Sequence, residues 1–90
     1  MNYEWDETKR IANLAKHGVD FVDAVGVFFD DYALTRRDPS SQEEDRLITL
    51  GMGASLRVLY VVWVERHGDT YRIISARKAS PGEIRQYQEG

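Results

Sequence analysis

Arginine is the residue type with the most definite chemistry in this sequence. Nine of the twelve basic side chains are arginines. A guanidinium keeps its charge at any working pH and binds phosphate oxygens through paired hydrogen bonds. On one face of a sheet, several of them would bind a phosphodiester and stabilise the charge that develops during its cleavage. The candidates for such a group, each in or beside an expected strand, are Arg46, Arg57, Arg66, Arg72 and Arg77. Taken singly, each is better explained as a solvated residue, most clearly Arg57 and Arg72.

Two side chains are candidates for proton transfer. His17 is a candidate general acid or base, because imidazole is the side chain suited to proton transfer near neutral pH. A histidine in the last turn of a helix is equally well explained by the helix dipole. Glu65 could act as a base or pair with an arginine of an adjacent strand. His67 falls at a hairpin tip, where we expect it to be exposed and without a chemical role.

Composition argues against several other kinds of site. The chain has no cysteine, which excludes disulfides and fits a cytoplasmic protein. Its two histidines lack a paired carboxylate motif, so no metal or other cofactor is expected. The longest apolar run, Val58–Val64, has seven residues, whereas a membrane-spanning helix needs about 20. The first six residues do not resemble a secretory signal.

The net charge of −3 is unevenly distributed along the chain. Residues 1–45 carry 5 basic and 11 acidic side chains, a balance of −6. Residues 46–90 carry 7 basic and 4 acidic side chains, a balance of +3. This asymmetry indicates a basic working surface in the second half. Acidic residues gathered in early loops and helix caps would produce the same asymmetry.

Local signals predict helices near both ends of the chain. Asp6 is a suitable N-cap and Gly18 a suitable stop for a first helix. Asp20 opens a second helix, because Phe21–Phe28 has apolar residues at helical spacing. Ser80–Glu83 combines an N-cap serine, a first-turn proline and a glutamate three residues later, which predicts a short third helix.

The region between the second and third helices has the pattern of a sheet. We expect strands at Tyr32–Arg37, Arg46–Met52, Arg57–Arg66 and Thr70–Lys78, and Tyr3–Trp5 could add a short edge strand. Alternation in the last strand directs Ile73 and Ser75 to one face and Arg72, Ile74 and Ala76 to the other. The predicted fold is α+β, with two N-terminal helices, an antiparallel four-stranded meander and a short C-terminal helix. Residues 1–90 are expected to form one domain.

The order of several motifs resembles the BrnT family of bacterial toxins from type II toxin–antitoxin systems. The resemblance covers nearly the whole chain. It begins with Tyr3-x-Trp5-Asp6-x-x-Lys9 and Asn13-x-x-Lys16-His17-Gly18-Val19-x-Phe21-x-x-Ala24. It continues through Phe28-x-Asp30-Asp31, Glu44-x-Arg46 and Leu50-Gly51. It ends with Glu65-Arg66, Arg72-Ile73-Ile74-Ser75-Ala76-Arg77-x-Ala79 and Glu83-x-x-x-Tyr87.

The resemblance implies a RelE-like fold and a small ribonuclease that inhibits translation. It also implies a BrnA-like antitoxin, whose ribbon-helix-helix part represses the operon, so that operator DNA is contacted only indirectly through the antitoxin. The implied substrate is RNA, and no contact with a membrane is expected. An alternative is a catalytically inactive BrnT-like binding module that acts as a co-repressor with its antitoxin.

The mechanism implied by the resemblance is metal-independent attack of a 2′-hydroxyl on the adjacent phosphate, which leaves a 2′,3′-cyclic phosphate. Arg46, Arg66 and Arg77 are then expected to contact the phosphate and the transition state, and His17 and Glu65 to act as acid or base. The further RNA-binding residues expected are Lys16, Arg72 and Lys78. Two departures from the family are the acidic overall charge, which implies weak and salt-dependent RNA binding, and Val64 at a position where a small polar residue is expected.

Overall fold

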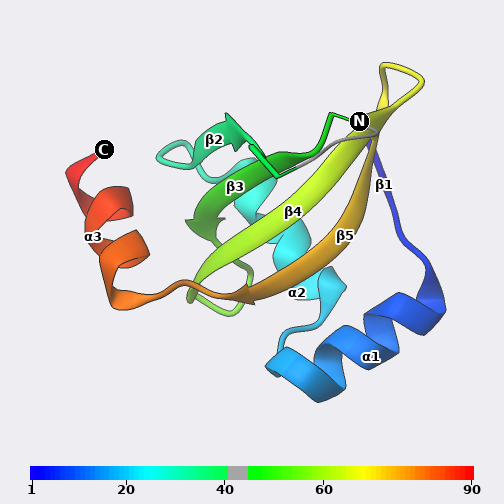
Figure 1. Ribbon diagram of the computed structural model, residues 1–90, viewed down its shortest axis with the longest axis horizontal. Coiled ribbons are helices and arrows are strands. Elements are labelled where there is room, and N and C mark those ends of the chain that lie inside the picture. The colour runs from blue at the N-terminus through cyan, green and yellow to red at the C-terminus, as the bar shows by residue number, and fades with distance from the viewer. Residues whose placement is uncertain (41–44) are drawn as a thin grey trace.

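A computed structural model describes residues 1–40 and 45–90 and shows a sheet with helices packed against it (Figure 1). The strands are β1 (Asn2–Glu4), β2 (Leu34–Arg37), β3 (Leu47–Met52), β4 (Val58–Arg66) and β5 (Thr70–Lys78). The helices are α1 (Glu7–His17), α2 (Phe21–Ala24), the 3-10 helix η1 (Val25–Phe29) and α3 (Pro81–Glu89). The predicted α+β class is therefore correct.

The sheet has five strands, in the order β1-β5-β4-β3-β2. The predicted antiparallel meander corresponds to β2 through β5. The prediction of a four-stranded antiparallel sheet is nevertheless wrong, because the optional N-terminal strand forms and pairs parallel to β5, with Tyr3 opposite Tyr71. The sheet is thus mixed, and its first and last strands in the sequence, β1 and β5, lie side by side (Figure 1).

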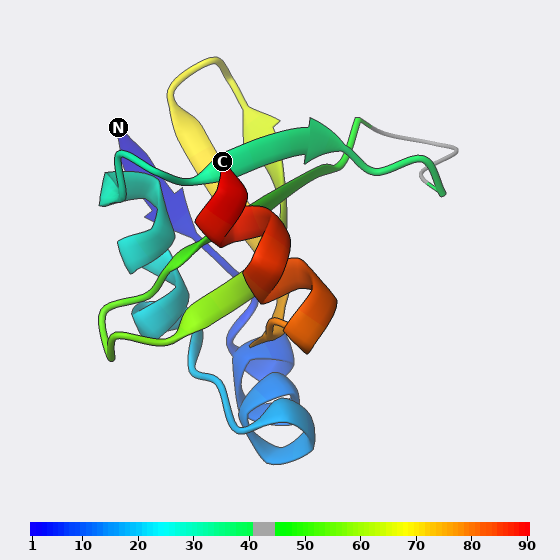
Figure 2. The same cartoon turned by 90° about the vertical axis from the view of Figure 1, so that its left-hand side faces the viewer.

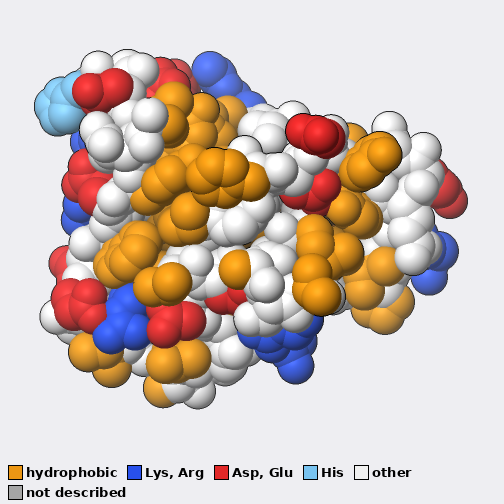
Figure 3. All heavy atoms as spheres, turned by 180° about the vertical axis from the view of Figure 1, so that it is seen from behind, with side chains coloured by type: hydrophobic (Ala, Val, Ile, Leu, Met, Phe, Trp, Pro, Cys, Tyr) orange, Lys and Arg blue, Asp and Glu red, His pale blue; other side chains and the backbone are white. Residues whose placement is uncertain are grey.

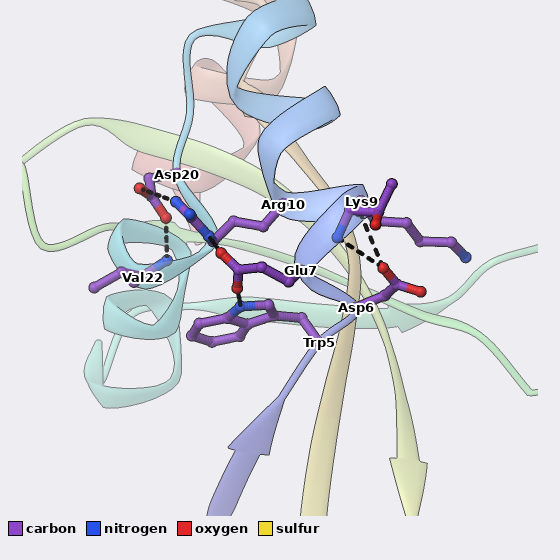
Figure 4. A network of polar contacts seen from close by, with 8 residues as sticks. Trp5, Asp6, Glu7, Lys9, Arg10, Asp20 and Val22 are labelled. Carbon is purple, nitrogen blue, oxygen red and sulfur yellow. Dashed lines mark hydrogen bonds and ion pairs between the residues drawn. The ribbon is translucent and has the colours of Figure 1, made fainter.

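Capping interactions fix both ends of α1, and Figure 4 shows those at its N-terminal end. The Asp6 carboxylate accepts hydrogen bonds from two backbone N–H groups of the first turn, at 2.8 and 3.2 Å. Gly18 ends the helix with φ of 70°, a conformation that glycine adopts without steric cost. Arg10 pairs with Glu7 on its own helix and with Asp20, which caps α2. These contacts join the two N-terminal helices.

The second helix differs from its prediction. Instead of a continuous α-helix over Phe21–Phe28, α2 ends at Ala24 and the tighter η1 follows. The segment Val25–Phe29 contains two β-branched residues and a glycine, which are weak helix formers. A Cβ at Gly26 would stand 2.5 Å from the backbone nitrogen of Ala54, so the local path also depends on close backbone contact.

The core lies between the sheet and α1, α2 and η1. It includes Phe21, Leu59, Val61, Ile73 and Ala76, all almost fully buried. Ile73 and Ala76 both face the core. The prediction that they lie on opposite faces of β5, which followed from strict alternation, is therefore wrong. The register between β4 and β5 shifts by one residue at Val62 and Trp63, because Ile74 of β5 has no partner there. This β-bulge allows Ile73 and Ala76 to face the same side of the sheet.

Asn13 joins α1 to an otherwise open part of β5. β1 pairs with β5 only as far as Arg72. Beyond that point, the buried Asn13 amide donates to the carbonyl of Ala76 at 2.8 Å and accepts from its N–H at 3.2 Å. The amide also donates to the carbonyl of Val19 at 2.9 Å. One side chain therefore satisfies backbone groups that a neighbouring strand would otherwise bind.

α3 lies against the other face of the sheet (Figure 2). Its predicted capping box is confirmed, because Ser80 and Glu83 each bond the other's backbone N–H. None of its residues is buried. Near its C-terminal end, the Tyr87 hydroxyl donates to Asp30 at 2.6 Å. Polar contacts therefore contribute much of the attachment of α3.

Candidate functional site

One face of the sheet carries a row of arginines. Since Val61 and Trp63 belong to the core, the alternate residues of β4, including Val64 and Arg66, point to the opposite face. Strand register extends this face to the neighbouring strands, because directly paired residues share a face. We call this surface the arginine face, because its arginines are Arg36, Arg46, Arg66, Arg72 and Arg77.

Three of these arginines surround Val64, which is only 3 % exposed. Arg72 is directly opposite Val64 on β5, and Arg66 follows two residues later on β4. On β3, Leu47 pairs with Trp63 of β4. Because the two strands are antiparallel, the preceding residue, Arg46, lies beside Val64. We call Arg46, Arg66 and Arg72 the Val64 cluster. These three expected site residues are brought together by the fold.

A carboxylate accompanies the Val64 cluster. Glu4, at the end of β1, is paired in register with Arg72. Its Oε2 lies 2.5 Å from Nη1 of Arg72, and the Glu4 side chain is 42 % exposed. A base is thus held directly beside cations that could bind a phosphate. No local pattern in the sequence points to Glu4, because its neighbour Arg72 is far away in the chain.

Arg77 occupies the opposite end of the β4–β5 hairpin. Arg66 pairs with Thr70 whereas Arg77 pairs with Tyr60, so six positions of β4, about 20 Å, separate the two arginines. The Arg77 guanidinium lies 3.8 Å from the Tyr60 ring centre. It donates two hydrogen bonds to Glu83, at 2.8 and 2.9 Å. These bonds lower the pKa of Glu83 to about 2 and raise the pKa of Arg77.

The remaining predicted residues lie away from the arginine face. Glu65 is opposite Tyr71, whose ring packs with Trp63, so Glu65 is on the other face of the sheet from its neighbour Arg66. Lys16 and His17 follow Asn13 by three and four residues, which places them on the same side of α1, toward the end of β5. Lys78 pairs with Leu59 and is exposed at that end.

A cavity of about 420 Å³ lies between α3 and the arginine face. Its sheet wall includes Leu34, Ile48, Leu50 and Tyr60, and its helix wall includes Gln86. We call this space the α3 cavity. Arg36, a member of the arginine face, also lines it. The opposite surface of the molecule differs, since hydrophobic side chains gather there over α2 and η1, where Val22 and Phe29 are exposed (Figure 3).

The described residues, 1–40 and 45–90, contain neither a cluster suited to a metal ion nor a helix suited to a membrane. No group of three or more His, Asp or Glu residues in that part of the chain is arranged to hold a metal ion. Within the same residues, no helix is long and apolar enough to cross a membrane.

A small α+β fold with arginines gathered on one face of its sheet presents guanidinium groups of the kind that bind a phosphodiester backbone. The family described as the ribonuclease toxin BrnT of type II toxin–antitoxin systems matches residues 5–83. The chain belongs to this BrnT family, as its motifs had indicated. Its family is therefore one of ribonuclease toxins whose systems include an antitoxin partner.

A solved structure supports the same assignment. The crystal structure of the Brucella abortus ribonuclease toxin BrnT is similar to this chain, with 32 % identity and a TM-score of 0.68. The similarity covers 89 % of this chain and 97 % of the Brucella chain. A comparison with curated proteins found no match.

Proposed function

We propose that this protein is an endoribonuclease toxin that cleaves RNA at the Val64 cluster and thereby inhibits translation. The observation that carries the proposal is the convergence of Arg46, Arg66 and Arg72 around one point of the sheet, with the Glu4 carboxylate beside Arg72. Guanidinium groups bind phosphate oxygens in pairs and offset the charge of a pentacoordinate phosphorane. A carboxylate within reach can accept a proton.

The proposed reaction uses the RNA's own hydroxyl as nucleophile. Glu4 accepts the proton of the 2′-hydroxyl, whose oxygen then bonds to the adjacent phosphorus. The bond from phosphorus to the 5′-oxygen breaks, and that oxygen takes a proton from solvent. The products are a 2′,3′-cyclic phosphate and a 5′-hydroxyl, and no step requires a metal because the arginines supply the positive charge.

Two roles follow for residues outside the cluster. Arg77 is too far from Arg66 to bind the same phosphate, so we assign it to a neighbouring part of the strand. Lys16, His17 and Lys78 would then extend the basic surface at the same end of the hairpin, without entering the reaction. Inhibition is assigned to a BrnA-like antitoxin, and the proposed site of action is the cytoplasm.

The test is cleavage of an end-labelled RNA by antitoxin-free protein, in EDTA and low salt. We expect cyclic-phosphate ends from the wild type and at least a hundredfold loss of rate in Arg66→Ala, because removal of one transition-state donor costs about 10²–10³ in rate. Arg85→Ala is the matched control, since Arg85 is exposed on α3 and lies off the arginine face. Full activity of Arg66→Ala would exclude the Val64 cluster as the site.

The base is tested by a second pair of variants. We expect Glu4→Gln to lose cleavage and Glu65→Gln to keep it, because only Glu4 shares a face with the cluster. The reverse result would assign the base to Glu65. Circular dichroism melts would show that both variants are folded.

A co-repressor without catalytic activity is the second candidate. It is favoured by the ion pairs that already engage Arg72 with Glu4 and Arg77 with Glu83. It predicts that expression without the antitoxin leaves cell growth unchanged, whereas the ribonuclease predicts growth arrest that Arg66→Ala relieves.

A further inference from the structure

The α3 cavity is open space beneath a helix that buries none of its own residues. On its sheet wall, Ile48 and Leu50 are sheltered from water, with 2 % and 7 % of their surface exposed. Leu34 and Tyr60 complete an apolar and aromatic wall. Facing it, α3 contributes polar side chains, Gln86 and Glu89 among them. A planar ligand with one polar edge would match this combination of walls.

The cavity is continuous with the arginine face. Arg36 and Tyr60 belong to both, and Arg77 lies over the Tyr60 ring beside the cavity. A strand whose phosphates follow the arginines would therefore pass the mouth of the cavity. In an RNA strand bound in this way, each sugar carries a nucleobase, which is planar and has a hydrogen-bonding edge. A nucleobase therefore has the shape and polarity that the cavity walls require.

We propose that the α3 cavity receives one unstacked nucleobase of the bound RNA, so that it selects which base lies beside the cleaved phosphate. This inference rests on the proposed function and adds a base-binding subsite to it. The apolar sheet wall would remove the base from water. The Gln86 amide, with both donors and an acceptor, would pair with its edge.

A binding measurement with RNA that cannot be cleaved tests the base pocket independently of catalytic activity. The probe is a short strand of abasic tetrahydrofuran spacers with one central 2′-O-methyl nucleoside, which cannot be cleaved because it has no free 2′-hydroxyl. A fully abasic strand of the same length reports phosphate binding alone. Fluorescence anisotropy in low salt would measure the affinity of the wild type for the fully abasic strand and for strands with A, C, G or U at the centre.

We expect the preferred base to tighten binding about tenfold over the fully abasic strand, and other bases to give less. Gln86→Ala should reduce the preference among bases, and Leu34→Trp, which fills the cavity from β2, should abolish the gain from any base. Gln88→Ala is the matched control, because Gln88 lies on the same helix and does not line the cavity. Arg66→Ala should weaken the binding of all strands alike.

Each contrary outcome has a distinct meaning. If the wild type binds neither kind of strand, the proposed function fails. If it binds both with equal affinity, or if folded Leu34→Trp keeps the gain from the base, RNA binding stands and the base pocket is wrong. If Leu34→Trp instead loses binding of the antitoxin and keeps the base preference, the cavity belongs to the protein partner and the proposal is overturned.

Discussion

Glu83 occupies the two guanidinium N–H groups of Arg77 that a phosphate would need. The two residues lie on either side of the junction between β5 and α3, so the pair also holds the start of α3 against the sheet. An RNA phosphate that approaches Arg77 must displace a carboxylate of the protein. Binding at this end of the arginine face is therefore opposed by a contact within the chain.

Replacement of Glu83 by Gln should tighten RNA binding. The neutral amide keeps an acceptor for the capping box but no longer competes with phosphate for Arg77. We expect a gain of about three- to tenfold in affinity for a non-cleavable RNA at low salt. Glu65→Gln removes the same charge from the opposite face of the sheet, away from Arg77 and the α3 cavity, so an equal gain in that variant would refute competition at Arg77.

The stability of the Glu83 pair should depend on acid pH. Hydrogen bonds from Arg77 lower the pKa of Glu83 from 4.5 to about 2. The stabilisation is therefore complete above pH 4.5 and is lost as the pH falls through about 2. Because Arg77 is 37 % exposed, screening limits the effect at pH 7 to about 1 kcal/mol. Urea unfolding should show this difference between wild type and Glu83→Gln at pH 7 and none near pH 2.

Asn13→Ala should destabilise the fold strongly. The substitution leaves the N–H and carbonyl of Ala76 and the carbonyl of Val19 without their partner in a buried setting. We expect a loss of about 3 kcal/mol in the free energy of unfolding, since each buried orphan group costs about 1–3 kcal/mol. Asn2→Ala, at an exposed position of β1, should change it by less than about 0.5 kcal/mol. A small effect of Asn13→Ala would show that water replaces the amide.

The bond from Tyr87 to Asp30 should make the position of α3 sensitive to alkaline pH. This hydrogen bond, with burial and the Asp30 charge, raises the pKa of Tyr87 from 10.0 to about 12. Its stabilisation is present below pH 10 and is lost as the pH rises through about 12. Tyr87→Phe should lose about 1–2 kcal/mol at pH 7, whereas Tyr32→Phe, exposed by 77 %, should lose nothing measurable. Ultraviolet titration should assign the last tyrosine ionisation to Tyr87.

RNA affinity should fall steeply with salt. If the five arginines of the face each neutralise a phosphate, the slope of log K against log salt is about −3.5, at about −0.7 per contact with a single strand. Arg66→Ala should reduce the slope by about 0.7, and Arg85→Ala should leave it unchanged. A slope near zero in the wild type would show that phosphate contacts do not dominate binding.

Local signals explain which parts of the fold could be predicted. The first helix and the start of α3 follow from N-caps, a glycine stop and a capping box, and strand Thr70–Lys78 follows from the hairpin turn at His67, all of which depend on residues close in sequence. The parallel pairing of β1 could not be predicted in this way, because Asn2 meets Thr70 only after the rest of the sheet has formed. The bulge at Val62 likewise depends on how two strands fit together.

The sequence allowed the residue types of the candidate site to be predicted, but it allowed less to be said about which residues the fold brings together. Arginine chemistry and the resemblance predicted Arg46, Arg66 and Arg77 at the phosphate and Arg72 as a further RNA-binding residue, whereas the strand register groups Arg72, and not Arg77, with Arg46 and Arg66. The separation of Glu65 from Arg66 follows from alternation along a strand, which the sequence already contains. Glu4 and Glu83 each meet an arginine of another element, so no local pattern could have revealed them.

The pairing of β1 with β5 has a consequence for the order of events during synthesis. β1 leaves the ribosome before the other strands of this sheet, but it cannot take its place there until residues 70–72 have also emerged, because those residues are its partners. Until then Glu4 has no Arg72 beside it. Long-range pairing of this kind delays folding. The contact between Glu4 and Arg72 is therefore completed only after the strand β5 has been synthesised.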